Sequence, residues 1–232
     1  MEQGKKELLE IILGLKIDHK RKGTLQLALE SARFYCGYKG DNYSSVDFIS
    51  RQGIIDKIIA ECGYSQNAEE GDLFSSLYLY FNCLEQIGNL FCENNQIKGI
   101  RRAIDFLPPN TLSHEEIVAV RVLRNALAHQ LGLMGSTYDN NKKKHFKFVL
   151  TFSEPTDDKS LKLPSIPWDG DCKDKKEETN TLVFVYPFIR MAETIIANAK
   201  KAYQDQKLSC LLSIEEIETR YTILIDDSNE KK

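Results

Sequence analysis

Apolar residues recur at helical spacing along most of the chain, and this pattern predicts a series of helices. The predicted helices cover residues 5–17, 24–38, 45–62, 72–94, 96–107, 113–131 and 187–206, and a shorter apolar element covers 214–224. The first two are separated by Arg21, Lys22 and Gly23, which form a break. The segment 72–94 is the most apolar of the long ones, and we expect it to be the central core helix.

The period of the pattern changes to two after Gly135. Residues 144–152 and 181–185 alternate in the manner of strands, and we expect them to pair with each other as a β-hairpin. The connection 153–180 holds three prolines and the only tryptophan, Trp168. A connection of this length is usually functional or disordered, so we interpret it as a flexible insertion. For Trp168, anchoring to the protein's own surface is favoured over stacking on a base.

The helix predicted over 113–131 has clear start and stop signals. Ser113 and Glu116 have the spacing of a capping box, Pro108 and Pro109 prevent an earlier helix from running through, and Gly132 supplies the end. One stripe of this helix is apolar and consists of Val120, Leu123, Leu127 and Leu131. We therefore expect this stripe to pack on the core.

The other side of this helix carries Arg121, Arg124, Asn125 and His129. We interpret this arc as partly buried or facing a cleft, because a solvated face more usually carries Lys and Glu. An arginine offers a planar charged fork for phosphate oxygens, and a histidine exchanges a proton near neutral pH. The alternative is structural: Arg124 makes an ion pair, and His129 is a core histidine or is stabilised at the helix C-terminus.

Charge is distributed unevenly along a chain of 232 residues with a formal net charge of −3. Residues 96–147 contain nine Lys and Arg against four Asp and Glu, a local net charge of +5. Lys142, Lys143 and Lys144 are consecutive in this region and are candidates for contacts with an RNA backbone. The alternative for them is a solvated turn before a strand.

The composition, 42% hydrophobic and 28% charged, is that of an ordinary globular protein. The first ten residues lack the apolar run of a signal peptide, and no stretch has the apolar length of a membrane helix, so we expect a cytoplasmic protein with no membrane partner. The six cysteines show no metal-binding spacing, which predicts reduced, buried thiols and no bound metal or other cofactor.

The hexapeptide from Arg124 to His129, Arg-Asn-Ala-Leu-Ala-His, resembles the RNxxxH signature of the HEPN superfamily. The order of predicted helices over 70–206, with Glu85 inside the core helix, is similar to the four-helix arrangement of that superfamily. The resemblance implies an all-α fold: a HEPN-like helical bundle at 70–206, an N-terminal helical extension at 1–66, a small inserted β-hairpin, and a C-terminal element with a charged tail at 207–232.

Members of the superfamily are commonly metal-independent ribonucleases that act as dimers, many in toxin, phage-defence or RNA-processing systems. The resemblance thus implies a homodimer that cleaves single-stranded RNA, with Arg124 holding the phosphate, His129 as general acid or base and Asn125 orienting the scissile group. Glu85, as an orienter or the ion-pair partner of Arg124 or Arg121, and Arg121 itself would be auxiliary residues.

Two alternatives remain open. The first is a catalytically inactive HEPN-like module that dimerises or binds nucleotide or RNA. The second is a toxin restrained by a separate antitoxin or regulatory protein. In some toxin–antitoxin pairs of the superfamily, a tyrosine two residues after the histidine is modified by the partner. Leu131 occupies that position here, which argues against this mode of control.

Overall fold

The computed structural model describes residues 2–36, 38–39, 42–43, 68–92, 99–130, 132–152, 155 and 159–225. The chain divides into two compact units: unit 1 comprises residues 1–86 and 209–232, and unit 2 comprises residues 87–208. The boundary lies inside helix α4 (Ala68–Leu90). These divisions differ from the predicted boundaries at 66, 70 and 206, and the helix predicted over 45–62 lies outside the described residues.

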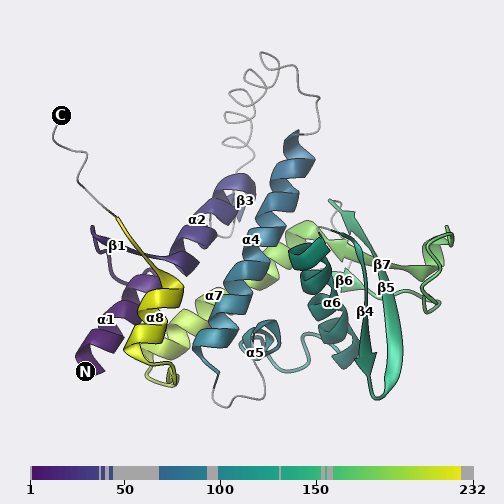
Figure 1. Ribbon diagram of the computed structural model, residues 1–232. Helices are drawn as coiled ribbons and strands as arrows, with labels where there is room; N and C mark the ends of the chain where they lie inside the picture. Colours follow the sequence, from purple (N-terminus) through teal and green to yellow (C-terminus); the bar gives the residue numbers. More distant parts are fainter. Residues whose placement is uncertain are drawn as a thin grey trace. The chain divides into compact units, whose positions relative to one another are not determined.

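Unit 1 is built from helices and short strand pairs (Figure 1). Its elements are α1 (Glu2–Ile12), β1 (Arg21–Gly23), α2 (Thr24–Cys36), β2 (Tyr38–Lys39), β3 (Asn42–Tyr43), most of α4, α8 (Ile214–Tyr221) and β8 (Thr222–Leu224). The predicted break at 21–23 is β1, which pairs antiparallel with β8, and β2 pairs antiparallel with β3. The N-terminal helices are therefore joined to the C-terminal segment by strand pairing.

The core of unit 1 consists of apolar side chains from α1, α2 and α4. Buried members include Leu8, Leu9, Ile12, Leu25, Leu29, Leu73, Leu77, Tyr80 and Leu84. The hydroxyl of Ser76 is buried in this core and donates a 2.9 Å hydrogen bond to the carbonyl oxygen of Ala32, which satisfies both polar groups. The prediction that the segment 72–94 is a core helix is confirmed for α4.

Unit 2 contains a four-stranded sheet with helices packed on it (Figure 1). Its elements are α5 (Ile100–Ile104), α6 (His114–Gln130), β4 (Met134–Asp139), β5 (Lys142–Thr151), β6 (Leu161–Lys162), a 3-10 turn (Glu177–Thr179), β7 (Asn180–Phe184) and α7 (Val185–Gln204). The strand order is β4-β5-β7-β6; β5 and β7 run parallel, and the other two pairs are antiparallel. Helix α6 packs against β4 and β5, and α7 follows β7 directly.

The β4–β5 hairpin is closed by a two-residue turn. Asn140 and Asn141 have φ angles of 49° and 61°, and two central residues with positive φ are the mark of a type I′ turn, which matches the twist of a hairpin. Asparagine tolerates this backbone region better than most residues.

At the other end of β4, Gly135 lies so close to α6 that an added Cβ would be 2.7 Å from Val122 Cγ1.

The predicted all-α fold is wrong, because 54% of the described residues are helical and 17% are in strands, and unit 2 contains a mixed sheet. The predicted hairpin between 144–152 and 181–185 is also wrong. Both segments are strands, but β5 and β7 pair in parallel, and the hairpin partner of β5 is β4. Alternation of apolar residues identifies a strand from its own residues, whereas its partner and direction depend on distant parts of the chain.

The segment between β5 and β7 contains β6 and a docked tryptophan. The side chain of Trp168 is 6% exposed, and its indole N–H donates a 3.1 Å hydrogen bond to the carbonyl oxygen of Asp171. Trp168 also forms a β-bridge with His145. The prediction that Trp168 anchors this segment is confirmed.

The cysteines within the described residues are free thiols. Cys36, Cys83, Cys92 and Cys210 are buried as predicted, but Cys172 is exposed, so the prediction is wrong for that residue. Among the helices that the structure describes, none combines the length and apolar character needed to cross a membrane.

Candidate functional site

Helix α6 positions the predicted catalytic residues, and a capping box fixes its start. The backbone N–H of Ser113 donates to Glu116 Oε2 at 2.7 Å, and the backbone N–H of Glu116 donates to Ser113 Oγ at 3.3 Å. These two hydrogen bonds satisfy donors that the first turn of a helix leaves without partners. The predicted capping box is confirmed.

The packing of α6 separates an apolar face from a polar one. The buried residues are Val118, Ala119, Val120, Val122, Leu123, Ala126 and Leu127. Arg121, Asn125 and His129 are exposed, and Arg124 is half-buried. Because Arg121, Asn125 and His129 follow one another at intervals of four, they form one exposed stripe along the helix. Partial burial is therefore found for Arg124 and not for the other three, and the alternative that this arc faces a cleft stays a prediction.

Arg124 and Asn125 are coupled by a hydrogen bond. Arg124 Nη1 donates to Asn125 Oδ1 at 3.0 Å. Side chains at adjacent helix positions normally diverge, so this contact draws the guanidinium towards the exposed stripe.

His129 lies in the last turn of α6. Its exposure excludes the interpretation of His129 as a buried core histidine. His129 is thus open to solvent and to any ligand on this face of unit 2.

The auxiliary residues lie in different units. Arg121 belongs to unit 2 with Arg124, whereas Glu85 is a half-buried residue of unit 1. Within unit 1, burial is the main cause that raises the pKa of Tyr221, and the negative charge of Glu85 adds to the effect. The ion pair between Glu85 and Arg124 or Arg121 stays a prediction.

The three consecutive lysines have different environments. Lys144 Nζ lies 2.9 Å from Asp139 Oδ2 and 3.0 Å from Glu115 Oε1, while Lys142 and Lys143 are exposed. His114 Nε2 lies 3.1 Å from the other oxygen of Asp139. The hydrogen bond from Lys144 is the largest cause that lowers the pKa of Asp139, and the contact with His114 lowers it further.

This network, which we call the tip network, consists of His114, Glu115, Asp139 and Lys144. It fastens the tip of the β4–β5 hairpin to the first turn of α6. This network was not predictable from the sequence, because its residues are brought together only by the hairpin and by the packing of α6 on β4. The adjacent asparagines 140 and 141 were the available signal for the turn.

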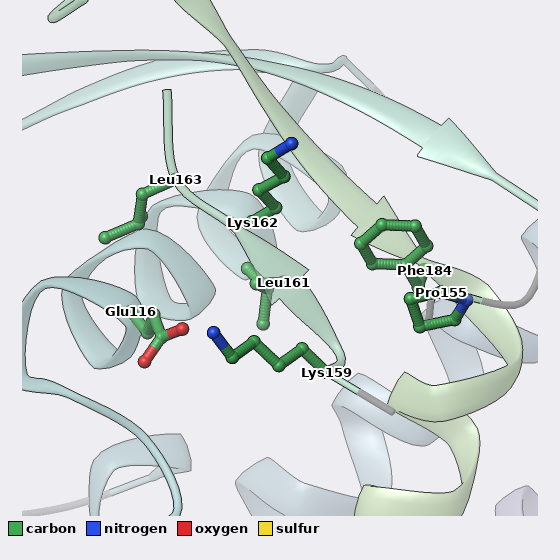
Figure 2. Close-up of a pocket in the computed structure, with 7 residues that line it drawn as sticks. All are labelled: Glu116, Pro155, Lys159, Leu161, Lys162, Leu163 and Phe184. Atoms are coloured by element: carbon green, nitrogen blue, oxygen red, sulfur yellow. The ribbon is translucent and has the colours of Figure 1, made fainter. Parts of the chain in front are cut away.

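A pocket of about 380 Å³ opens elsewhere in unit 2 (Figure 2). The described residues that line it are Glu116, Pro155, Lys159, Leu161, Lys162, Leu163 and Phe184. In Figure 2 the ammonium group of Lys159 points towards the carboxylate of Glu116. Glu116 is in the first turn of α6, whereas His129 is in the last, so the pocket is not built from the predicted catalytic residues.

Within the described ranges, no group of three His, Cys, Asp or Glu side chains is placed to hold a metal ion. No protein-family model, curated protein or solved structure matches this chain. Any assignment of function therefore depends on the chemistry of the α6 face and on the resemblance of residues 124–129.

Proposed function

We propose that this chain is a metal-independent endoribonuclease of the HEPN type, with Arg124, Asn125 and His129 at its active site. The observation that carries the proposal is the α6 face itself. It presents an arginine fork hydrogen-bonded to Asn125 and, one turn further along, an exposed imidazole. These are the groups that a phosphodiester cleavage by general acid–base chemistry requires.

In the proposed reaction, the ribose 2′-hydroxyl attacks the adjacent phosphorus. Its proton passes to a neutral imidazole, the bond from phosphorus to the 5′-oxygen breaks, and that oxygen takes up a proton. The products are a 2′,3′-cyclic phosphate and a free 5′-hydroxyl. Arg124 counters the charge that develops on the phosphate oxygens, and Asn125 holds the guanidinium in place.

The need for two proton transfers supports a homodimer. One imidazole takes the proton of the nucleophile while a second, protonated imidazole delivers a proton to the leaving group. A single chain supplies one His129 on this face, so a second copy of the chain would complete the site. The exposure of the stripe formed by Arg121, Asn125 and His129 is compatible with such an arrangement.

The biological setting that we propose is RNA cleavage in the cytoplasm as part of a toxin or phage-defence system. A separate antitoxin or regulatory protein would restrain the activity until it is needed. The toxin or phage-defence setting and the restraining partner come from the resemblance of residues 124–129 alone.

Cleavage of a panel of single-stranded RNAs in the presence of EDTA tests the proposal. We expect wild type to cut and to leave cyclic phosphate ends, and His129→Ala to lose roughly a hundredfold to ten-thousandfold of the rate. Arg124→Ala should lose a comparable factor, and Arg124→Lys should restore little because a point charge cannot replace the planar fork. Gln130→Ala is the matched control, because Gln130 is an exposed neighbour of His129 in the same turn.

Thermal unfolding and the oligomeric state must be measured on the same variants. His129 is exposed, so its removal should leave both nearly unchanged. Unfolding or dissociation of His129→Ala would show that the histidine is structural. A wild-type protein that leaves every RNA intact would replace the nuclease proposal with an inactive module that dimerises or binds nucleotide or RNA.

A further inference from the structure

One face of the β4–β5 hairpin points away from α6 and carries exposed side chains; we call it the outer face. Burial alternates along β4: Met134, Ser136 and Tyr138 are exposed, and the residues between them are less so. Gly135 contacts Val122 of α6, and Asp139 belongs to the tip network, so this set faces α6. Since successive side chains of a strand alternate, Met134, Ser136 and Tyr138 point away from α6.

Tyr138 is the most exposed aromatic side chain in the described part of the chain. Its side chain is 74% exposed, against 51% for Phe34 and 38% for Tyr35. It lies near the end of β4, which is an edge strand of the sheet. An aromatic ring in this position leaves both its apolar area and its π-face open to a ligand.

A cation lies beside this ring. Lys143 is the direct cross-strand partner of Tyr138, and directly paired residues project from the same face of a sheet. Lys143 is exposed. Lys142 pairs with Asp139 and therefore projects from the opposite face, and Lys144 is engaged by Asp139 and Glu115, so Lys143 is the lysine of this triplet that shares the outer face with the tyrosine.

The tip that carries these residues is held rigidly. The Asn140–Asn141 turn fixes the register in which Tyr138 is opposite Lys143, and the tip network fastens the hairpin to α6. Because the backbone that carries Tyr138 and Lys143 is already in place, binding does not have to order the backbone of the hairpin. This arrangement is a preformed surface for a ligand with a flat aromatic group next to negative charge.

We propose that Tyr138 and Lys143 form a binding site for single-stranded RNA. One unpaired base stacks on the ring of Tyr138, and the ammonium group of Lys143 contacts a neighbouring phosphate. Duplex RNA does not fit this site, because its bases already stack on one another within the helix. The proposal names the substrate contact of the proposed nuclease and rests on that function only for the identity of the nucleic acid.

The test uses the full chain with His129→Ala, which allows binding to be measured without cleavage. Fluorescence anisotropy with labelled oligoadenylate and oligouridylate should show that Tyr138→Ala weakens binding roughly 5- to 150-fold, the range for loss of one stacked base. Tyr138→Phe and Tyr138→Trp should bind nearly as well as the parent, because the ring and not the hydroxyl is used. Ile166→Ala, which removes another exposed apolar side chain of unit 2, should have no effect.

A second readout isolates the charges. Lys143→Gln should reduce the slope of log affinity against log salt by about 0.7, the value for one lost contact with a single-stranded backbone. Lys144→Gln should leave that slope unchanged, because Lys144 is engaged by Asp139 and Glu115. If the parent, Lys143→Gln and Lys144→Gln all have the same slope, Lys143 does not contact a phosphate.

The outcomes separate this site from the proposed catalysis. If Tyr138→Ala binds as tightly as its parent while wild type cleaves RNA, the stacking site is wrong and the nuclease proposal stands. If wild type cleaves nothing but Tyr138→Ala loses affinity, the binding site stands alone. Equal affinity for duplex and single-stranded RNA, or no RNA binding at all, would overturn the inference.

Discussion

Asp139 has a central place among the residues of unit 2, because its two carboxylate oxygens serve two different partners. One oxygen meets Lys144 Nζ at 2.9 Å and the other meets His114 Nε2 at 3.1 Å. The hydrogen bond from Lys144 lowers the pKa of Asp139 more than the contact with His114 does. The charged form of the carboxyl is therefore favoured by folding.

This lowered pKa gives the stability of the protein a defined dependence on pH. A carboxyl whose pKa is depressed in the folded state contributes stability that is fully present above its unfolded pKa, about 4, and is lost as pH falls through the folded value. We expect Asp139→Asn to remove part of the fall in stability below about pH 4. Denaturant unfolding between about pH 2 and pH 6 measures the change.

Variants of the two partners provide an internal control for that measurement. Lys144→Gln should reduce the fall in stability at acid pH more than His114→Ala does, because Lys144 lowers the pKa of Asp139 more than His114 does. If the free energy of unfolding of Asp139→Asn falls at acid pH as steeply as that of wild type, the charged form of this carboxyl is not stabilised by folding.

At the scale of the elements, the contact between β4 and α6 leaves no room for a side chain at Gly135. A Cβ at Gly135 would be 2.7 Å from Val122 Cγ1, and 3.7 Å from the Cβ of Ala126. A valine in a helix has essentially one rotamer, so it cannot turn away from a new methyl group. Strand β4 can approach α6, the helix that carries the candidate site, this closely because residue 135 is a glycine without a Cβ.

We expect Gly135→Ala to lower the free energy of unfolding by about 1–3 kcal/mol through overpacking. Val122→Ala in the same chain should recover part of this loss, because it removes the methyl group that the new Cβ meets. Gly132→Ala is the control, since a Cβ there has no neighbour closer than 3.7 Å. Equal effects of Gly135→Ala and Gly132→Ala on urea unfolding would contradict the steric explanation.

The local elements were predictable from the sequence, and the pairing of strands was not. The helices at 24–36, 68–90 and 114–130 follow from their own apolar periodicity and caps. By contrast, the β4 segment Met-Gly-Ser-Thr-Tyr-Asp has a weak apolar alternation and was missed. The parallel pairing of β5 with β7 depends on the path of the chain between them, which local residues do not encode.

The same limit applies to the candidate site. The spacing of Arg124, Asn125 and His129 placed them on a helix opposite its apolar stripe, and this placement needs only the helical period. Their exposure could not be derived, because it depends on which elements pack against α6. Likewise, the three lysines at 142–144 were equivalent in sequence, and the ion pairs that occupy Lys144 come from α6 and β4.

At the scale of the whole molecule, each of the two units buries apolar side chains, and each has a capping box at the start of one helix. Ser113 and Glu116 cap α6 in unit 2, and Ser213 and Glu216 form a capping box at α8 in unit 1. The only tryptophan, Trp168, is buried in unit 2. Its fluorescence therefore reports on unit 2, whereas circular dichroism reports on the helices of both units.

We expect each unit to unfold as a separate cooperative element, since each is compact and buries apolar side chains. Loss of a capping serine costs about 0.5–2 kcal/mol. Ser113→Ala should thus lower the denaturation midpoint seen by Trp168 fluorescence, while Ser213→Ala should leave that midpoint unchanged and lower only a component of the circular dichroism transition. The two variants are matched, because each removes the same hydroxyl from the same motif. If Ser213→Ala shifts the fluorescence midpoint as far as Ser113→Ala does, the chain unfolds as one cooperative body, and a change in either unit would then also alter the stability of the face formed by Arg124, Asn125 and His129.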